Sequence, residues 1–208
     1  PTMTEDARIG PNAITRLAEA LRDHAGEEAA RKVFETAGLA AMLDAPPERM
    51  VRQDAVVRLY AALAREIPME ATRFAAEAGR LTADYLLARR IPKAAQFVLK
   101  RLPAALAAPL LLKAIGGNAW TFAGDGDFSW SGWSAPEVTV TNGPFASPGA
   151  AREPLGAFYG AVFGRLFRAL VSRSMHAEAI AKDGRCVVRL RHSGAPDSSR
   201  LRDAAARG

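Results

Sequence analysis

The residues of this chain best suited to holding a ligand are flat aromatic ones, and they gather in one stretch. Residues 118–133, NAWTFAGDGDFSWSGW, hold all three tryptophans and two of the nine phenylalanines. Across 118–131 the aromatic residues occupy even positions, which is the period of a strand. The pattern predicts a hairpin that turns at residues 124–126. Its aromatic face would carry two facing pairs, Phe122 with Phe128 and Trp120 with Trp130. Such a face either closes a core or offers a platform for a flat ligand.

Cations gather just before the aromatic stretch. Between residues 89 and 113 the chain has no acidic residue, and its basic residues there are Arg89, Arg90, Lys93, Lys100, Arg101 and Lys113. A cluster of one sign attracts an acidic ligand, an acidic partner or an anionic membrane surface; the alternative is a merely solvated face. We do not expect nucleic-acid binding, because exposed aromatic residues do not alternate with these cations.

Two of the three histidines belong to a second predicted hairpin, residues 175–192. A three-residue turn, Lys182-Asp183-Gly184, would pair Ala181 with Arg185. In this register His176 and His192 share a face, and either could be an axial metal ligand. The alternative is a pair of ordinary, half-exposed strand histidines.

The same register brings the single thiol of the chain beside a carboxylate. Glu178 and Cys186 would share the inward, mostly apolar face, but two ligands are too few for a structural zinc, which takes four. The remaining motifs do not favour an enzyme. GDGDFS lies in a predicted turn rather than between a strand and a helix, and the chain has no phosphate-binding loop, HExxH or CxxC.

The elements that must position these residues are helical first and extended later. In the first half, apolar residues recur at helical spacing up to residue 90, beginning with Ile14, Leu17 and Leu21. Pro92 then begins the basic segment, which Pro103 and Pro109 should kink or break. A later helix, residues 154–172, carries three glycines four positions apart, which would let another element approach closely: Gly156, Gly160 and Gly164.

This order predicts an α+β fold, in which N-terminal helices pack on an antiparallel sheet of about four to five strands, with a long helix between the last two hairpins. The chain has 208 residues, 49% of them hydrophobic, and a net charge of +6. We expect one domain over residues 1–192, with a helical part at 10–117 and a sheet-bearing part at 118–192, and a mobile tail at 193–208. Its one cysteine fits a reducing compartment. The longest uncharged apolar run, residues 102–112, has eleven residues. A spanning helix needs roughly 20.

Several segments resemble the 4-vinyl-reductase domain family. In the C-terminal half these are VTVTNGPFA, the glycine-bearing helix and AEAIAKDGRCVVRL; in the N-terminal half, GPNAITRLAEALRDHAGEEAARKVFETAGL is similar to the helical opening of the photosynthetic members. The resemblance covers most of residues 8–192. It implies a twisted antiparallel sheet flanked by helices, as in vesicle-tethering subunits and haem–nitric-oxide-binding domains, and it implies a homodimer. In the phenol-sensing members a Glu and several Cys hold zinc. Glu178 and Cys186 match two of those positions, whereas Ala181 replaces a third, so the resemblance implies a lost zinc site.

The resemblance also implies a part in bacteriochlorophyll biosynthesis, in the cytoplasm or peripherally at the inner membrane. The ligand would be a magnesium porphyrin, either magnesium protoporphyrin or its monomethyl ester, with no tightly bound cofactor. Protein partners would be pathway enzymes such as the large subunit of magnesium chelatase and the magnesium-protoporphyrin methyltransferase. The stacking candidates are Trp120, Phe122, Phe128, Trp130, Tyr85 and Phe97. The propionates, or a membrane, would meet Arg89, Arg90, Lys93, Lys100 and Arg101, and the magnesium would meet His176 or His192.

Three functions stay open at this point. The first is a carrier that binds the pigment and passes it between enzymes. The second is a reductase of the 8-vinyl group, which needs a hydride or electron donor for which the sequence shows no motif. The third is a scaffold that binds only proteins.

Overall fold

The computed structural model describes residues 7–146 and 149–193. Helices dominate the first part and strands the second. In chain order the elements are β1 (Arg8–Ile9), α1 (Asn12–Ala25), α2 (Glu27–Thr36), α3 (Ala40–Asp44), β2 (Val51–Arg52), α4 (Gln53–Glu66), α5 (Ala71–Arg89), α6 (Lys93–Leu99), α7 (Ala104–Gly116), α8 (Trp120–Ala123), β3 (Asp127–Ser131), β4 (Glu137–Thr141), a 3₁₀ turn (Gly143–Phe145), α9 (Arg152–Leu170), β5 (Met175–Lys182) and β6 (Arg185–His192). The tail expected to be mobile lies, from residue 194 onward, outside the described residues.

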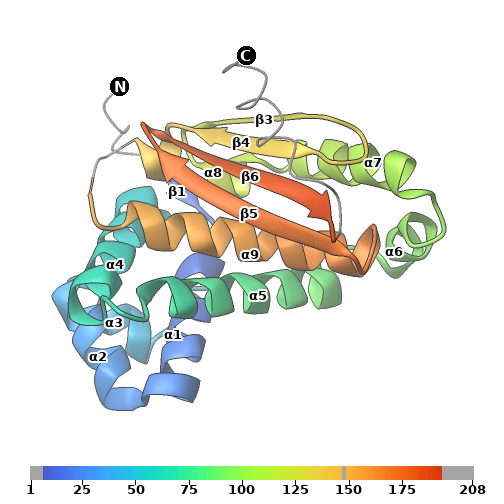
Figure 1. The fold of residues 1–208 in the computed structure, drawn as a ribbon. Helices are drawn as coiled ribbons and strands as arrows, with labels where there is room; N and C mark the ends of the chain where they lie inside the picture. Colours follow the sequence, from blue (N-terminus) through green and yellow to red (C-terminus); the bar gives the residue numbers. More distant parts are fainter. Residues whose placement is uncertain (1–6, 147–148, 194–208) are drawn as a thin grey trace.

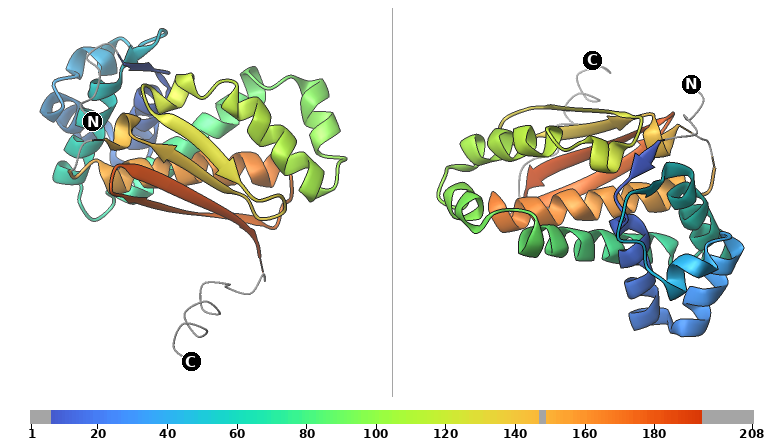
Figure 2. Two further views of the ribbon diagram at one scale, coloured as in Figure 1. Left: turned by 90° about the horizontal axis from the view of Figure 1, so that it is seen from above. Right: turned by 180° about the vertical axis from the view of Figure 1, so that it is seen from behind.

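The architecture has three layers. The four-stranded sheet, in the order β3-β4-β6-β5, is antiparallel throughout, α9 covers one of its faces, and α5 packs on the far side of α9 (Figure 1). Helices α1 to α4 form a lobe at one end of these layers, while α6 and α7 lie at the other end (Figure 2). The predicted α+β class is therefore confirmed, as is the long helix between two hairpins.

The first helix shows how the N-terminal lobe follows from sequence. Ile14, Leu17 and Leu21 are fully buried, as their helical spacing predicts. Gly26 ends α1 with a φ of 88°, a conformation that costs glycine little. The short β1–β2 ribbon, which the sequence pattern did not predict, pairs Ile9 with Val51.

Glycines set the distance between α9 and the sheet. A β-carbon placed on Gly156, Gly160 or Gly164 would lie only 3.0, 2.8 or 2.9 Å from the β-carbons of the β5 alanines 181, 179 and 177. Helix and strand therefore meet almost backbone to backbone. The close approach that the glycine spacing predicts is confirmed.

The prediction of a hairpin over residues 118–131 is wrong. Trp120 and Phe122 lie on α8, where the amide of Phe122 donates to the carbonyl of Ala119 at 3.0 Å. The carbonyl of Thr121 accepts a 2.7 Å hydrogen bond from Gly10, which ties α8 to the N-terminal segment. Strand β3 pairs instead with the β-branched strand β4, and Trp130 faces Val138. A tertiary contact has overridden the local alternation.

The register of the last hairpin differs from the prediction by one residue. Its turn has two residues, Asp183 and Gly184, with φ values of 52° and 75°, so Lys182 rather than Ala181 pairs with Arg185. A one-residue slip moves every side chain of one strand to the opposite face. Cys186, Val188 and Leu190 on β6 point inward as predicted, but the side chains of β5 are interchanged.

The prolines of the basic segment have different effects. Pro103 immediately precedes α7, but Pro109 lies inside it and does not end the helix. The residue that loses its hydrogen-bond donor to this proline is Ala105, which is exposed, so water can satisfy its carbonyl. None of the described helices combines the length and the apolar character needed to cross a bilayer.

Candidate functional site

Aromatic rings do meet where α8, β3 and α9 come together. Phe122 contacts Phe128 edge to face, with ring centroids 5.5 Å apart, and Phe163 of α9 lies 6.2 Å from Phe122. Phe128 and Phe163 are stacked at 6.4 Å with 14° between their planes. We call Phe122, Phe128, Tyr159 and Phe163 the aromatic cluster. The Phe122–Phe128 contact was predicted, although it comes from a helix facing a strand.

Tyr159 fixes the cluster in place. Its hydroxyl donates a 2.5 Å hydrogen bond to the carbonyl of Phe122, and its ring packs 5.2 Å from that of Phe145. Burial holds the pKa of Tyr159 well above its ordinary value, so the hydroxyl stays a neutral donor. The end of α7 covers the cluster: a β-carbon on Gly116 would sit 3.4 Å from the ring of Phe128. Tyr159 and Phe163 are therefore buried, while Phe122 and Phe128 are partly buried, with the end of α7 against Phe128.

The other stacking candidates do not belong to the aromatic cluster. Trp130 is partly buried on the same face of β3 as Phe128, whereas Trp120 is 61% exposed. Tyr85 has the guanidinium of Arg16 at 4.9 Å from its ring centroid and that of Arg90 at 6.0 Å. Phe97 is exposed on α6 beneath the guanidinium of Arg101, 4.0 Å away.

The predicted cations come together around α6. Arg89 ends α5, Lys93 begins α6, and Arg90, Lys100 and Arg101 flank that helix; all five are exposed. We call these five residues the cationic rim. The helices that carry them, the end of α5 and α6, lie at the end of the molecule opposite the lobe of α1 to α4 (Figure 2).

The histidines do not share a face. His176 pairs with Arg191, while His192 pairs with the buried Met175 on the other face of the hairpin. Each imidazole contacts a serine: Nε2 of His176 lies 2.5 Å from Ser193 Oγ, and Nδ1 of His192 lies 2.8 Å from Ser174 Oγ. The prediction that both histidines share a face is wrong, because the register of the hairpin differs from the predicted one by one residue. Neither ring takes part in the aromatic cluster.

The two positions matched to zinc ligands are also separated. Cys186 is buried on the inner face, and Glu178 lies on the outer face opposite Arg189. Burial raises the pKa of the Cys186 thiol to about 12, so the thiolate that metals require is disfavoured. Within residues 7–146 and 149–193, no three His, Cys, Asp or Glu side chains come together in a geometry for a metal.

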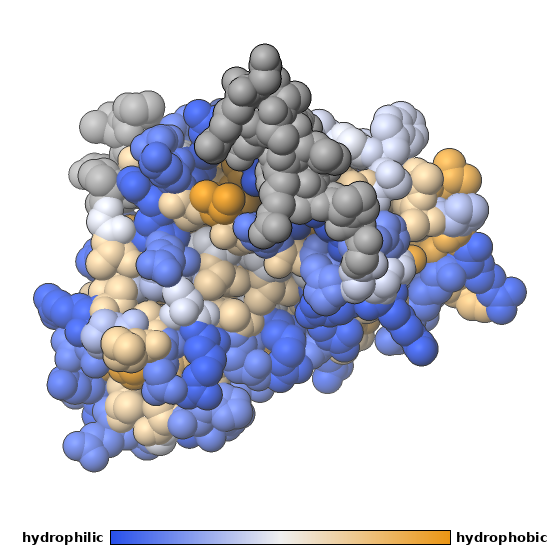
Figure 3. Space-filling view, in the orientation of Figure 1, coloured by the Kyte–Doolittle hydropathy of each residue, from blue (hydrophilic) through white to orange (hydrophobic). Residues whose placement is uncertain are grey.

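An open groove, which the sequence pattern did not predict, runs between α5 and β5 over α9. It has a volume of about 440 Å³ and a floor of small residues, visible as pale atoms near the centre of Figure 3. Its lining includes Thr72, Ala76, Ala157, Ala161, Arg168 and Ala179. The glycine spacing on α9 was the one sequence signal for this region.

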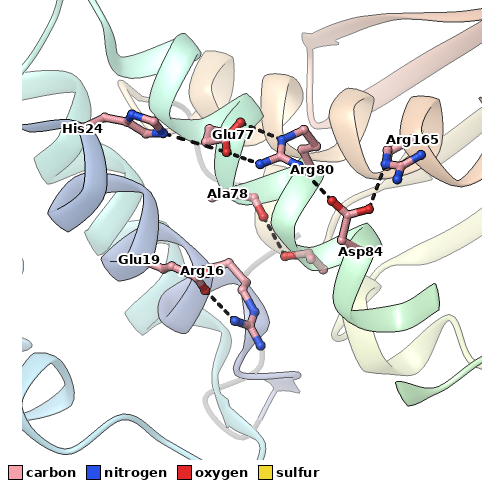
Figure 4. A network of polar contacts seen from close by, with 9 residues as sticks. Arg16, Glu19, His24, Glu77, Ala78, Arg80, Asp84 and Arg165 are labelled. Carbon is pink, nitrogen blue, oxygen red and sulfur yellow. Dashed lines mark hydrogen bonds and ion pairs between the residues drawn. The ribbon is translucent and has the colours of Figure 1, made fainter. Parts of the chain in front are cut away.

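A chain of ion pairs ties α5 to its neighbours beside this groove (Figure 4). Arg80 pairs with Glu77 at 2.5 Å and with Asp84 at 2.8 Å, and the other oxygen of Asp84 accepts from Nε of Arg165 on α9 at 2.8 Å. His24 of α1 lies 4.0 Å from Glu77. Hydrogen bonds from Arg80, together with its charge, hold the pKa of Glu77 below its ordinary value. The arrangement is structural, since its charges satisfy one another.

Comparison with curated proteins places the chain among proteins of pigment synthesis. It is 38% identical over 164 residues to the bacteriochlorophyll synthase 23 kDa chain of Cereibacter sphaeroides, covering 79% of each chain. It is 32% identical over 177 residues to the protein of the same name from Rhodobacter capsulatus, covering 85% of this chain and 82% of the relative. The chain belongs to the family of the bacteriochlorophyll synthase 23 kDa chain. The predicted relation to bacteriochlorophyll biosynthesis is thereby confirmed, although no family model matches the chain.

Solved structures share the fold at low sequence identity. The H-NOX protein from K. algicida superposes with a TM-score of 0.63 at 10% identity, covering 91% of this chain and 99% of that one. A structure solved to probe haem distortion in the H-NOX family gives a TM-score of 0.58 at 13% identity, covering 89% and 96%. The arrangement of helices and sheet is therefore that of the H-NOX fold.

Proposed function

We propose that the protein binds a magnesium porphyrin intermediate of bacteriochlorophyll biosynthesis and presents it to the enzymes of the pathway. The ligand is magnesium protoporphyrin or its monomethyl ester. The receiving enzymes include the large subunit of magnesium chelatase and the magnesium-protoporphyrin methyltransferase. Binding without reduction fits the sequence, because GDGDFS lies at the link from α8 to β3 and not at the start of a helix.

The observation that carries the proposal is that a chain of this family has the fold of H-NOX proteins. Similar H-NOX structures were solved to study haem distortion and the effect of porphyrin distortion on redox potential, so those proteins hold a porphyrin. The present chain combines the same arrangement of elements with relatives named for bacteriochlorophyll synthesis. A magnesium porphyrin is the ligand that suits both facts.

The aromatic cluster, with Trp130 beside it, is the floor on which we place the macrocycle. Phe128 and Trp130 lie on the same face of β3, and Gly116 at the end of α7 lies against the ring of Phe128. Helices α6 and α7 make few contacts beyond each other and β3, whereas α5 and α9 pack along their length. Outward movement of α6 and α7 would uncover a flat apolar surface, and the propionates would then meet Arg89, Arg90 and the rest of the rim.

A pigment titration tests this proposal. Purified protein is titrated with magnesium protoporphyrin and, separately, with its monomethyl ester, followed by absorbance. Trp130→Ala should weaken binding by about 1–3 kcal/mol, the scale of an aromatic stacking contact. The matched control is Trp133→Ala, because Trp133 is 67% exposed in the β3–β4 loop and should leave affinity unchanged. Charge reversal of Arg89 and Arg90 should weaken binding most at low salt.

The same titration separates the alternatives. Conversion of a divinyl pigment to the monovinyl form by the protein and NADPH would show a reductase rather than a carrier. Absence of binding at micromolar pigment would leave the protein-binding scaffold. Equal losses in Trp130→Ala and Trp133→Ala would show that the pigment does not stack on the aromatic cluster.

A further inference from the structure

Large apolar side chains are exposed mainly on one segment. Of the eight such residues in the described part of the chain, five lie between residues 97 and 120: Phe97, Val98, Leu106, Leu110 and Trp120. On α7 the exposure has a helical period, because Leu106 and Leu110 lie four positions apart on the outer face, while Leu111 and Leu112 are buried on the inner one. An apolar stripe facing solvent marks an interaction surface.

The cations among these side chains are unpaired. Residues 85–124 contain no Asp or Glu. Within the described structure, no carboxylate lies within ion-pair distance of Arg89, Arg90, Lys93, Lys100, Arg101 or Lys113. Elsewhere pairing is common, as in Arg31 with Asp44, Arg58 with Asp54 and Arg189 with Glu137. The positive charge of this segment is therefore available to an anionic partner outside the described part of the chain.

We infer that these residues form a docking surface for an anionic lipid bilayer. The α6–α7 surface consists of the exposed apolar residues Phe97, Val98, Leu106, Leu110 and Trp120 and of the six unpaired cations. Apolar side chains of an amphipathic helix enter the boundary between headgroups and acyl chains, while Lys and Arg hold anionic headgroups. Arg101 over the ring of Phe97 combines both contacts in one pair. In Figure 3 hydrophobic and hydrophilic atoms lie side by side at this end of the molecule.

The composition favours a bilayer over a protein partner. The surface includes three lysines, and lysine is depleted from protein–protein interfaces, whereas anionic membranes attract it. With only 13 residues, α7 lies in the interface rather than across it. Docking does not require the pigment, so it stands or falls separately from the proposed function.

Vesicle co-sedimentation of the full chain, without pigment, tests the inference. We expect the protein to sediment with vesicles of phosphatidylcholine mixed with phosphatidylglycerol, and not with phosphatidylcholine alone. Reversing two charges in Lys100→Glu/Arg101→Glu should weaken binding more than about tenfold, since each cation near an anionic surface contributes separately. The matched control, Lys182→Glu/Arg185→Glu, makes the same charge change at the far β5–β6 turn and should bind as the unmodified chain does.

An apolar pair of variants tests insertion separately from charge. Leu106→Ser/Leu110→Ser should lose binding at high salt, where headgroup attraction is screened. Ile180→Ser, a similar change at an exposed position on β5, should retain it. Failure of the unmodified chain to sediment with anionic vesicles overturns the inference and leaves the surface to a protein partner. Equal binding by every variant also overturns it.

A site-specific label locates the contact. Leu110→Cys carrying a polarity-sensitive fluorophore should shift to shorter wavelength when anionic vesicles are added, while labelled Ile180→Cys should not. The only native cysteine, Cys186, is buried, so it does not compete for the label. A shift at residue 180 with none at residue 110 would place the membrane on the sheet and contradict the α6–α7 surface.

Discussion

Helices α9 and α7 differ in what their outer residues contact: glycines of α9 pack against a strand, whereas leucines of α7 face solvent. On α9, Gly156, Gly160 and Gly164 bring the backbone against β5, and Arg165 is paired with Asp84 of α5. On α7, Leu106 and Leu110 point to solvent beside cations that no described carboxylate neutralises. These contacts of α9 are made within the chain, whereas the outer face of α7 is open to solvent.

We expect this difference to distinguish residues that stabilise the fold from residues that are free to contact a partner. The layers of β5, α9 and α5 pack closely, and Asp84 of α5 pairs with Arg165 of α9, so we expect these layers to dominate the free energy of unfolding. The segment from α6 to α8 leaves apolar surface and charge exposed, which stability alone does not favour. Substitutions on the two sides should therefore have different consequences.

The largest effect is expected at the glycine row of α9. In Gly160→Leu, the new β-carbon would sit 2.8 Å from that of Ala179, which is too close for two carbon atoms, so the helix or the strand would have to shift. The free energy of unfolding should fall by about 3 kcal/mol, the upper part of the range for overpacking. Thermal and urea unfolding measure it.

The control is Gly117→Leu. Gly117 is exposed at the end of α7 with a φ of −61°, and a β-carbon there meets nothing closer than 3.6 Å. In Gly117→Leu the free energy of unfolding should change by less than about 0.5 kcal/mol. A similar loss in both variants would show that the close approach of α9 to β5 does not limit the fold.

The two faces of α7 provide the next test. Leu112 is fully buried, so Leu112→Ala should lower the free energy of unfolding by about 2 kcal/mol, the low end for a core leucine, because α7 has few neighbouring elements. Leu110→Ala should change it by less than about 0.5 kcal/mol. Equal losses would mean that the outer face of α7 is held by the fold and is not an interaction surface.

A smaller effect is expected from the Asp84–Arg165 pair that joins α5 to α9. Both side chains are about one-third exposed, so solvent screens their attraction. A double-mutant cycle with Asp84→Asn and Arg165→Gln should give a coupling energy of about 0.5–1 kcal/mol. Reversing the order of effects, with this pair outweighing Gly160→Leu, would show that charge rather than close packing holds the two helices together.

The sequence predicts the individual helices and strands better than it predicts which of them pair with one another. Helical spacing identified the buried stripe of α1, and the glycine spacing of α9 identified its packing, because both depend on one element's own periodicity. Strand β3 had two possible partners: residues 118–123, if they were extended, and β4. Alternation within 118–131 could not decide between them, since the hydrogen bond from Gly10 to Thr121 joins segments over a hundred residues apart.

The register of the last hairpin could have been predicted more closely. Asp183-Gly184 is a typical two-residue turn, in which both residues take positive φ, as they do here. Including Lys182 in the turn moved Glu178 to the wrong face and placed both histidines together. The ion pair of Asp84 with Arg165 gave no such signal, because its partners lie 81 positions apart on two separate helices.

The smallest effect is expected for Glu77, whose contribution to stability should depend on pH. Hydrogen bonds from Arg80, then its charge and that of His24, lower the pKa of Glu77 from the ordinary 4.5. A carboxylate whose pKa is lower in the folded state binds fewer protons there than in the unfolded chain, so its contribution to stability is present above pH 4.5 and is lost as the pH falls through the folded value. Near neutral pH, Glu77→Gln should be less stable than the unmodified chain by less than about 1 kcal/mol, because the pair is partly solvated. The difference should begin to shrink below pH 4.5 and disappear once the pH is below the folded pKa of Glu77, which urea unfolding at a series of pH values measures. A difference that persists in acid would mean that Glu77 stabilises α5 through packing, and the contrast between a charge-paired α5 and an unpaired α6–α7 surface would then rest on Asp84 and on the pair of Arg73 with Glu70.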